Sequence, residues 1–296
     1  RGLGDVYKRQ GYTMTAFDKH QVAVFRFVRC DFAADTGVAQ LVYAFDDGPE
    51  LIETVTIPGA PFVLEGDRAE AVQRALRLLH LIAGVSYYKA GVPEQVRIDS
   101  YSIDAATAAL VETVYLNGLG EFAYRNGLNL RGRFRLPVEG EAFAAPALGL
   151  REHALVAIGG GKDSLVSIEA LRSLGIAETV TWIGGSQLIR ACAERTGLPI
   201  LNIGRTLAPE LFELNRQGAW NGHIPVTAVN SAIMVLAALL QGVDQVVFSN
   251  ERSASYGSQI PGTGEVNHQW SKGWAFEQAF GEHLEPVSYT HLTLPT

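Results

Sequence analysis

The sequence predicts an α/β fold in which a smaller α+β domain precedes a doubly wound parallel sheet. From Arg151 onward, short apolar runs alternate with amphipathic segments, and the links between them are only a few residues long. The first run, residues 154–158, leads into three glycines and then into Leu165, Ile168 and Leu171 at helical spacing. A strand, a glycine turn and a helix in this order are typical of a parallel sheet that binds a ligand at the carboxyl ends of its strands.

The elements of the N-terminal domain, residues 14–137, follow from alternating and helical patterns. We expect strands at Val22–Val28, Val38–Phe45, Leu51–Ile57 and Val96–Ile103, and helices at Arg68–Ala83 and Ala105–Tyr124, the second interrupted by Gly118 and Gly120. Residues 46–49 form the turn between two of these strands, and residues 137–150, rich in Gly, Pro and Ala, form a linker. The N-terminal domain is therefore expected to mix strands and helices without regular alternation.

The second domain, residues 151–285, is predicted to alternate strands and helices. We expect strands at Ala154–Ile158, Thr179–Ile183, Pro199–Ile203 and Gln245–Phe248, and helices after the glycines and at Ser186–Thr196, Ala208–Gln217 and Pro225–Gln241. Such alternation favours a doubly wound sheet with helices on its faces.

The composition excludes several classes of protein. Of the 296 residues, 47% are hydrophobic and 19% are charged, which is enough to form a core. The net charge of −7 gives no reason to expect a nucleic-acid partner, and the apolar run at Ala232–Leu240 is too short to span a membrane. Two cysteines and the absence of a signal-peptide pattern favour a cytoplasmic protein in a reducing compartment.

Both ends of the chain look foreign. Asp5–Gln10 and Val287–Thr296 resemble translated sequencing-adapter read-through. We therefore expect residues 1–13 and 287–296 to be non-native and Met14 to be the native start. The native protein is then expected to continue beyond Pro286 into a C-terminal part that this chain lacks.

The glycine turn and the residues after it are the principal candidate site. Glycines allow backbone N–H groups to approach an anion closely, and the positive end of the helix dipole adds to the attraction. The order Gly159, Gly160, Gly161, Lys162, Asp163, Ser164 does not fit a Walker A loop, because Asp163 follows the lysine and Val156 replaces the first glycine. It does not fit a dinucleotide fingerprint either, because the third glycine position is serine. The alternative is a glycine turn without a ligand.

A second candidate segment follows the apolar strand that ends at Phe248. Asn250, Glu251 and Arg252 come directly after it, which places them at the carboxyl edge of the predicted sheet. Glu251 and Arg252 alone would be interpreted as a surface ion pair. With the glycine loop on the same edge, we favour a role in the site.

Two polar loops contain the remaining candidates. His223 precedes the long apolar helix that begins near Pro225, and it fits an acid–base residue or a phosphate donor as well as it fits a capping or packing residue. Asn267, His268 and Lys272 lie in a polar run that is typical of a binding loop, although solvated loops have the same composition. Both interpretations remain open for each loop.

The two cysteines, Cys30 and Cys192, raise the possibility of a racemase with one thiol on each face of the substrate carbon. Cys30 ends a predicted strand, and Cys192 lies within a predicted helix between two alanines. Buried structural cysteines are the interpretation that we favour.

The loop resembles the Ser-Gly-Gly-x-Asp-Ser loop of the ATP pyrophosphatases, with Gly159 in place of the leading serine. The segments taken together resemble the UDP-N-acetylmuramoyl-L-alanyl-L-glutamate epimerases of some Gram-negative bacteria. The resemblance rests on Val22–Cys30, Tyr43–Glu50, Leu81–Lys89, Tyr115–Tyr124, Gly159–Ser164, His223–Thr227, Ser249–Ala254 and Asn267–Lys272. It covers nearly all of the chain between the foreign ends and implies a sheet like that of the adenine nucleotide alpha hydrolases.

The resemblance implies an isomerase that inverts the terminal glutamate of a UDP-muramoyl dipeptide and converts ATP to AMP and pyrophosphate. It implies that residues 159–164 bind ATP, that Asp163 binds Mg²⁺, and that Asn250, Arg252 and Asn267 bind the substrate. The residues do not identify the base, for which Glu251, His223, His268 and Lys272 are the candidates. The alternatives are another adenylating enzyme, such as an amidotransferase or a tRNA thiolase, and an ATP-binding fragment without catalysis.

Overall fold

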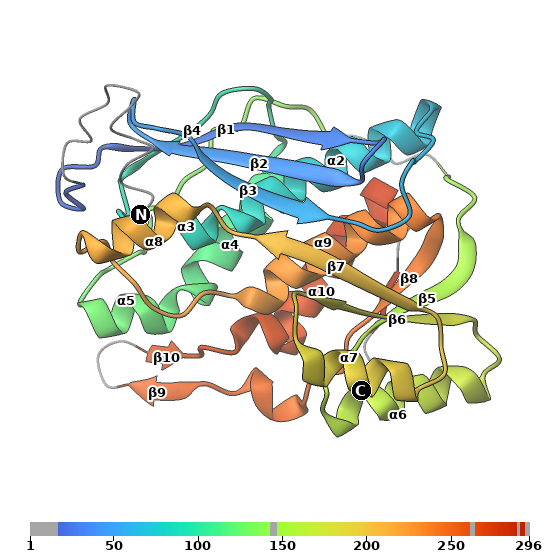
Figure 1. Cartoon of the computed structure of the whole chain (residues 1–296). Coiled ribbons are helices and arrows are strands. Elements are labelled where there is room, and N and C mark those ends of the chain that lie inside the picture. Colours follow the sequence, from blue (N-terminus) through green and yellow to red (C-terminus); the bar gives the residue numbers. More distant parts are fainter. Residues whose placement is uncertain (1–16, 143–146, 261–263, 289–290, 294–296) are drawn as a thin grey trace, which may run out of the picture.

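One sheet crosses both halves of the chain in the computed structural model, which describes residues 17–142, 147–260, 264–288 and 291–293. Within these ranges, nine strands pair in the order β11-β8-β5-β6-β7-β3-β2-β1-β4 (Figure 1). Neighbours from β11 to β7 are parallel, the pairs from β7 to β1 are antiparallel, and β4 is parallel to β1. The predicted α/β class is confirmed, and the continuous parallel region lies in the C-terminal half.

The elements have the following bounds. The strands of this sheet are β1 (Val24–Ala33), β2 (Val38–Phe45), β3 (Leu51–Thr56), β4 (Gln95–Ile98), β5 (Arg151–Ala157), β6 (Glu178–Ile183), β7 (Ile200–Thr206), β8 (Val243–Val247) and β11 (His291–Thr293); β9 (Ser258–Ile260) and β10 (Gly264–Val266) form a hairpin. The helices are α2 (Gly66–Ala83), α3 (Val85–Tyr88), α4 (Ala105–Gly118), α5 (Gly120–Asn126), α6 (Lys162–Ser173), α7 (Gln187–Arg195), α8 (Pro209–Arg216), α9 (Val226–Gln241) and α10 (Trp274–Ser288), with short 3₁₀ turns η1 (Arg252–Ser255) and η2 (Trp270–Lys272).

Helices pack on both faces of the parallel strands. Val156 of β5 packs with Ile168 of α6 in one hydrophobic cluster, which also includes residues of α7. Leu155, the neighbouring residue of β5, belongs instead to the large cluster that contains α9. Because successive side chains of a strand point to opposite faces, β5 is covered on both sides. The parallel strands are thus enclosed by helices, as in an α/β fold.

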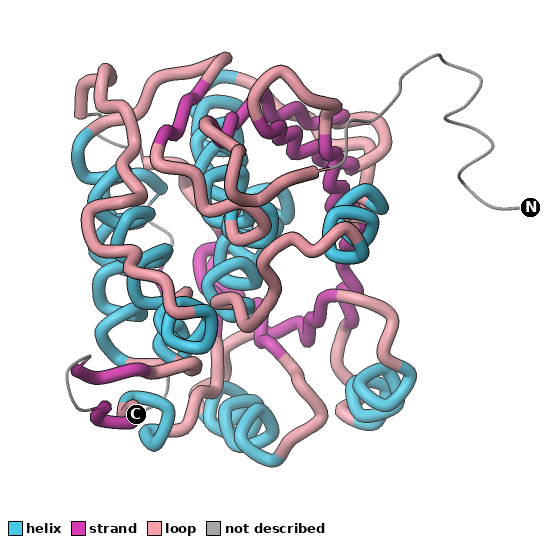
Figure 2. The backbone as a smooth tube through the Cα atoms, turned by 90° about the vertical axis from the view of Figure 1, so that its left-hand side faces the viewer, coloured by secondary structure: helices cyan, strands magenta, loops and turns pink. Residues whose placement is uncertain are grey.

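In the N-terminal half, the helices gather on one face of the sheet. α2 packs under β1 and β2 and lies against α9, and the side view shows a stack of helices on one side of the strands (Figure 2). Twelve of the sixteen residues of α9 are buried, because α2 and the sheet enclose it. Arg68 of α2 donates hydrogen bonds to the carbonyls of Leu239 (3.2 Å) and Leu240 (2.8 Å) at the C-terminal end of α9, where a cation is favourable.

An aromatic cluster fills the core under β1 and β2. Phe25, Phe27 and Tyr43 are fully buried, and the Tyr43 ring stacks on that of Tyr87 at 4.6 Å between centroids. His80 lies in this cluster and bonds the Val42 carbonyl through Nε2 at 3.0 Å. Burial lowers the pKa of His80 to about 4, so the ring is neutral at physiological pH and acts as a packing residue.

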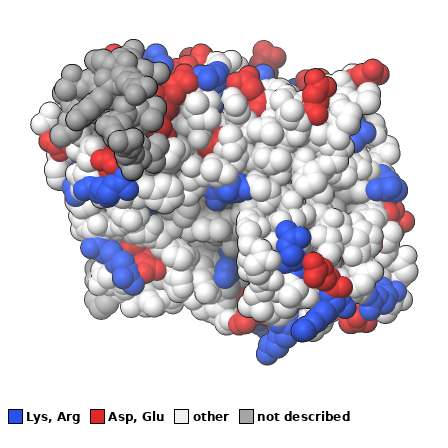
Figure 3. All heavy atoms as spheres, in the orientation of Figure 1, with Lys and Arg blue, Asp and Glu red and all other residues white. Residues whose placement is uncertain are grey.

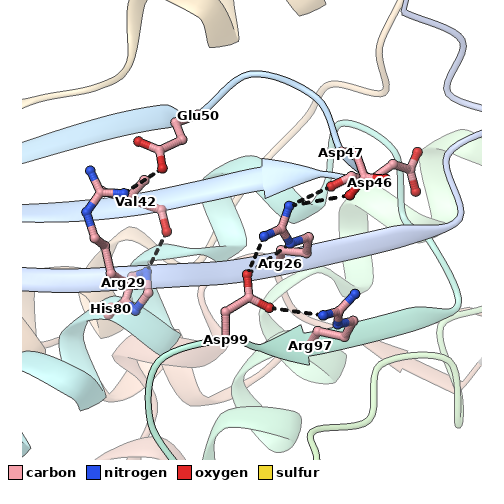
Figure 4. Close-up of polar contacts among 9 residues, drawn as sticks. All are labelled: Arg26, Arg29, Val42, Asp46, Asp47, Glu50, His80, Arg97 and Asp99. Atoms are coloured by element: carbon pink, nitrogen blue, oxygen red, sulfur yellow. Dashed lines mark hydrogen bonds and ion pairs between the residues drawn. The ribbon is translucent and has the colours of Figure 1, made fainter.

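Charged side chains hold β1, β2 and β4 together (Figure 4). Arg26 pairs with Asp99 at 2.7 Å and donates to the Asp46 carbonyl at 3.0 Å. Arg29 of β1 pairs with Glu50, the residue before β3, at 2.5 Å. The interactions of Arg26 and Arg29 therefore help to hold the N-terminal strands in register.

On the face shown in Figure 3, acidic and basic side chains are interspersed rather than gathered by sign.

The two halves of the sheet join where β3 pairs antiparallel with β7. The junction comprises three residue pairs, among them Val55 opposite Arg205. Arg205 donates from Nε to Oε1 of the fully buried Glu53 at 2.7 Å and from Nη2 to Ser86 at 3.3 Å. Burial tends to lower the pKa of Arg205, but the charge and hydrogen bond of Glu53 raise it overall, so the guanidinium stays charged.

Several predicted elements have different bounds in the structure. β1 runs to Ala33 rather than Val28, because a register shift between Phe27 and Arg29 interrupts the alternation while the pairing with β2 continues. The strand expected at residues 96–103 ends at Ile98, where the pairing of β4 with β1 stops.

The single helix expected at residues 105–124 is two helices, α4 and α5, that meet at Leu119. A Cβ on Gly118 would lie 2.4 Å from the Pro225 ring, so this glycine permits a close approach of the chain. The predicted domain boundaries and non-native ends stay predictions. Residues 1–16 lie outside the described residues, and residues 291–293 pair with β8.

We predict that Arg205→Met destabilises the protein by about 3–5 kcal/mol, because it leaves Glu53 buried without a counter-charge. Urea unfolding followed by circular dichroism measures the loss. The double variant Arg205→Met/Glu53→Met should recover much of it, since an apolar pair removes the buried charge.

The control is Arg172→Met, which removes an exposed ion pair to Glu169 (2.5 Å) and should cost less than about 1 kcal/mol. Equal losses in Arg205→Met and Arg172→Met would contradict the role that we assign to the buried pair.

Candidate functional site

The glycine loop lies between the carboxyl end of β5 and the start of α6. Gly160 has a φ of 81°, a conformation that glycine adopts without strain. Gly161 is the N-cap of α6, and no side chain caps this helix end. A Cβ added to Gly159 or Gly161 would meet no atom within 4 Å. The loop therefore presents its backbone to open space, as the cradle for an anion requires.

The three residues after the glycines differ in exposure. Lys162 is exposed, Asp163 is half-buried, and Ser164 is buried and donates to the Gly161 carbonyl at 3.2 Å. Within the described part of the chain, neither the Lys162 ammonium nor the Asp163 carboxylate makes a hydrogen bond or an ion pair. One cation and one anion are thus available beside the cradle.

The loop lies at the point where the strand order reverses. From β5 the chain continues to β6 and β7 on one side, and then returns to place β8 on the other side of β5. Parallel sheets bind ligands at such a crevice between the carboxyl ends of two strands. Ser167 of α6 and Ser249, two residues after β8, are 2.6 Å apart between their hydroxyl oxygens. This hydrogen bond joins α6 to the segment that follows β8.

The predicted residues after β8 therefore lie at the same edge as the glycine loop. Asn250 is half-buried, whereas Glu251 and Arg252 are exposed. Glu251 does not pair with Arg252; its Oε2 accepts a hydrogen bond from Ser253 at 2.9 Å. Among the described residues, Arg252 has no ion-pair partner. The sequence-based alternative of a surface salt bridge between the two is wrong.

The loop that carries Asn267 packs against η1, which follows β8. The Asn267 amide donates to the Ala254 carbonyl at 2.8 Å, and its oxygen accepts from the Gln269 N–H at 2.9 Å. Asn267 is thereby used to hold two loops together. Lys272 is exposed, and its ammonium makes neither a hydrogen bond nor an ion pair in the part of the chain that the structure describes.

His223 and His268 come together although they are 45 positions apart in the sequence. Their rings meet edge to face at 5.4 Å between centroids. His268 Nδ1 lies 3.6 Å from Glu121 of α5, which also pairs with Arg125 at 2.6 Å. Both histidines are exposed, so the pair is open to a ligand. Within the described ranges, no hydrogen bond, ion pair or ring contact joins this pair to the glycine loop.

The structure adds residues that sequence reasoning missed. Ser249 and Glu121 lie within segments that carry the resemblance, but no local pattern links either one to its partner. A pocket of about 260 Å³ opens elsewhere, between α4 and the segment around Phe134, and none of the predicted site residues lines it. We place the candidate site at the strand edge, because the polar groups converge there.

The cysteines do not form a pair. Cys30 is buried in the large core cluster, and burial raises the pKa of its thiol to about 12. Cys192 belongs to the cluster under α6 and α7, with its sulfur 3.9 Å from the position of a Cβ on Gly160. The two thiols lie in different clusters, which supports the structural interpretation for Cys30. Across the described residues, no group of three or more His, Cys, Asp or Glu residues is arranged to hold a metal.

Comparison with known proteins assigns the family. The family model of the MurL N-terminal domain matches residues 16–293. The chain belongs to this family. A UDP-N-acetyl-alpha-D-muramoyl-L-alanyl-L-glutamate epimerase of Xanthomonas oryzae pv. oryzae is 80% identical over 273 residues, which are 92% of this chain and 60% of that protein. No solved structure matches the chain.

More distant relatives carry the same name. The epimerases of Salinispora tropica and of a Micromonospora strain are each 42% identical over 257 residues, or 84% of this chain. The chain spans 55% of the former and 57% of the latter. The MurL N-terminal domain described here thus corresponds to a little more than half of each of these relatives. None of its described helices combines the length and apolar character that crossing a bilayer requires.

Proposed function

We propose that the protein containing this chain inverts the terminal L-glutamate of UDP-N-acetylmuramoyl-L-Ala-L-Glu to D-glutamate through an acyl-adenylate, and releases AMP and pyrophosphate. The names of the relatives support the substrate and the epimerisation. The observation that carries the use of ATP is the open glycine cradle between β5 and α6, at the reversal of the strand order.

The chemistry explains why an epimerase would need such a cradle. The Cα–H beside a free carboxylate is very weakly acidic, because the carbanion would form next to an existing negative charge. A carboxylate oxygen attacks the α-phosphorus of ATP, and the bond to the β-phosphate oxygen breaks. The resulting mixed anhydride lacks that charge, so a base can remove the proton and leave an enolate. A proton then returns to the opposite face, and water releases AMP and restores the carboxylate.

The residues present fit a nucleotide and Mg²⁺. The uncapped N–H groups at the start of α6 and the Lys162 ammonium suit phosphate oxygens. Asp163 supplies a single carboxylate, which is sufficient for Mg²⁺ because this ion is usually held by one or two carboxylates together with substrate phosphates. Bound there, Mg²⁺ would neutralise charge on the leaving pyrophosphate. In this proposal, residues 159–164 bind ATP, and the parallel half has a fold like that of the adenine nucleotide alpha hydrolases.

The remaining candidates form two groups, only one of which lies beside the glycine loop. Asn250 and Arg252 lie on the ligand edge beside the glycine loop and suit the carboxylate and phosphate groups of the substrate. His223 and His268 form a separate exposed pair. Glu251 is exposed, and its Oε2 already accepts a hydrogen bond from Ser253. We propose His223 and His268 as the proton-transfer pair and keep Glu251 and Lys272 as the alternatives.

We predict that Gly161→Val weakens ATP binding about 10- to 100-fold, because the side chain fills the space that the phosphates occupy and removes hydrogen bonds to charged oxygens. Because Gly161 has a φ of −90° and open space around it, folding should lose only about 1 kcal/mol through poorer capping.

Calorimetric titration of this chain with ATP measures the affinity. Gly281→Val, at another glycine with open space, is the matched control and should leave binding unchanged. Undiminished affinity in Gly161→Val would remove the loop from the nucleotide site.

The products of ATP provide the second test of the proposed function. We predict that the full-length protein with the muramoyl dipeptide nucleotide forms AMP and pyrophosphate and no ADP, because attack at the α-phosphorus expels pyrophosphate. Ion-pair chromatography of the nucleotides decides the point. Formation of ADP and orthophosphate would assign the protein to a different class of nucleotide hydrolase.

Exchange of the glutamate Cα–H with solvent tests the order of steps. In deuterated water with substrate and ATP, the full-length protein should place deuterium at Cα of the product, detected by mass spectrometry. Omission of ATP, or Asp163→Asn, should suppress the exchange. His223→Gln and His268→Gln should leave AMP formation in place and slow the exchange by about 10²- to 10⁴-fold, the usual contribution of a general base.

Glu251→Gln is the parallel variant. If Glu251→Gln loses the Cα–H exchange while both histidine variants keep it, Glu251 is the base. Exchange that proceeds normally without ATP would overturn the mechanism.

A further inference from the structure

Lys89 is a buried cation that the chemistry described above does not use. It follows α3, and its side chain is only 6% exposed. Its ammonium donates to Oδ1 of Asn221 at 2.5 Å. Within the described residues, no carboxylate pairs with it, although buried charges in proteins are normally paired. Burial lowers the pKa of Lys89 to about 8, because the charged ammonium is removed from water.

The partner of this lysine is a residue that shapes a loop. Asn221 Oδ1 accepts from Lys89 and also from the Gly222 backbone N–H at 2.9 Å. The Trp220 N–H donates to the Ala90 carbonyl at 3.0 Å, so two adjacent bonds join this loop to the segment after α3. A Cβ on Gly222 would lie 3.0 Å from the Phe122 ring, which shows that the loop also rests on α5.

His223 is the next residue of this loop. Its ring reaches across to His268, which in turn lies beside Glu121 of α5. The His223 side chain is exposed, and no hydrogen bond holds it within the described part of the chain. Its place beside His268 therefore depends on the backbone conformation of residues 221–223, which the bond from Lys89 helps to fix.

We propose that Lys89 is a positioning residue that holds the Asn221–His223 loop in place and so keeps His223 beside His268. The inference rests on the proposed function only in assigning His223 to proton transfer. The positioning itself follows from the hydrogen bonds of Asn221. Among the described residues, no hydrogen bond or ion pair joins the Lys89 side chain to the glycine loop, His223 or His268, so it acts through Asn221.

The first experiment uses this chain and requires no activity. Diethyl pyrocarbonate modifies exposed imidazoles, and mass spectrometry of the peptide that contains His223 follows the rate. Lys89→Met and Asn221→Ala should each raise the rate of modification of His223 severalfold, because the loop is released and the contact with His268 opens. The double variant should react no faster than either single variant, since both remove one shared interaction.

Lys19→Met is the matched control. Lys19 also packs on this loop, with its ammonium 3.7 Å from the centroid of the Trp220 ring, but it does not bond Asn221. In the Lys19→Met variant, diethyl pyrocarbonate should modify His223 at the native rate. If Lys89→Met fails to fold, the exposed position Asn221 still provides the test. Equal modification rates in native, Lys89→Met and Asn221→Ala proteins overturn the proposal.

The second experiment uses the full-length protein. Lys89→Met and Asn221→Ala should slow ATP-dependent Cα–H exchange by on the order of 100-fold, the effect of displacing a reacting group by about 1 Å. The KM for ATP should stay unchanged, because the cradle is not touched. A rise in the KM for ATP with unaltered exchange at saturation would overturn the positioning role. If native protein shows no ATP-dependent exchange, the proposed function fails, while the modification rates still decide whether Lys89 positions the loop.

Discussion

The junction of β3 with β7 is the constraint on which the rest of the structure depends. Three residue pairs connect an antiparallel half of the sheet to a parallel half, and the buried pair of Glu53 and Arg205 crosses the same place. Below the sheet, α2 packs against α9, so the two halves share one hydrophobic core. A buried ion pair contributes little net stability when its desolvation is counted, but it makes other registers of the two strands costly. It therefore fixes how one half lies on the other.

This junction makes the candidate site a product of both halves. The glycine loop and the residues after β8 belong to the parallel half, and their positions follow from the strand reversal alone. The histidine pair is different, because Glu121 approaches His268 from α5 and Lys89 holds the loop of His223 from the end of α3. The N-terminal half thus contributes directly to the surroundings of the proposed proton-transfer groups. We infer that it is part of the site rather than a separate module.

Local features of the structure could be predicted from the sequence, and long-range ones could not. The strand at Val38–Phe45 has the predicted bounds, and the glycine loop lies between a strand and a helix as expected, because alternation and glycine spacing are encoded in adjacent residues. The pairing of β3 with β7 and the bond from Lys89 to Asn221 join segments 132 or more positions apart, and no local pattern specifies them. The bulge in β1 was missed for a related reason, since it depends on the partner strand.

The candidate site residues show the same difference between local and long-range features. Gly159–Ser164 could be proposed as a phosphate cradle because such a loop has a sequence pattern, whereas the meeting of His223 with His268 depends on how two loops are folded. Lys89 drew attention in the sequence only as the end of Leu81–Lys89, one of the segments that carry the resemblance, because a sequence does not show that a charge is buried. Its role follows from its low exposure and its single neutral partner in the described chain.

Three cations of the candidate site have charges that are available to an anionic ligand. Many arginines of this chain are paired with carboxylates, such as Arg26 with Asp99 and Arg135 with Glu112. Lys162, Arg252 and Lys272 have no such partner among the described residues, and they lie in the glycine loop, after β8 and in the loop that packs on η1. The chain carries a net charge of −7, which repels ATP and a nucleotide-linked dipeptide at long range. Salt largely screens charges that are more than about 8 Å apart. Unpaired cations at the edge itself therefore decide whether an anion binds there. We infer that these three side chains are available to the phosphates and carboxylates of the proposed ligands.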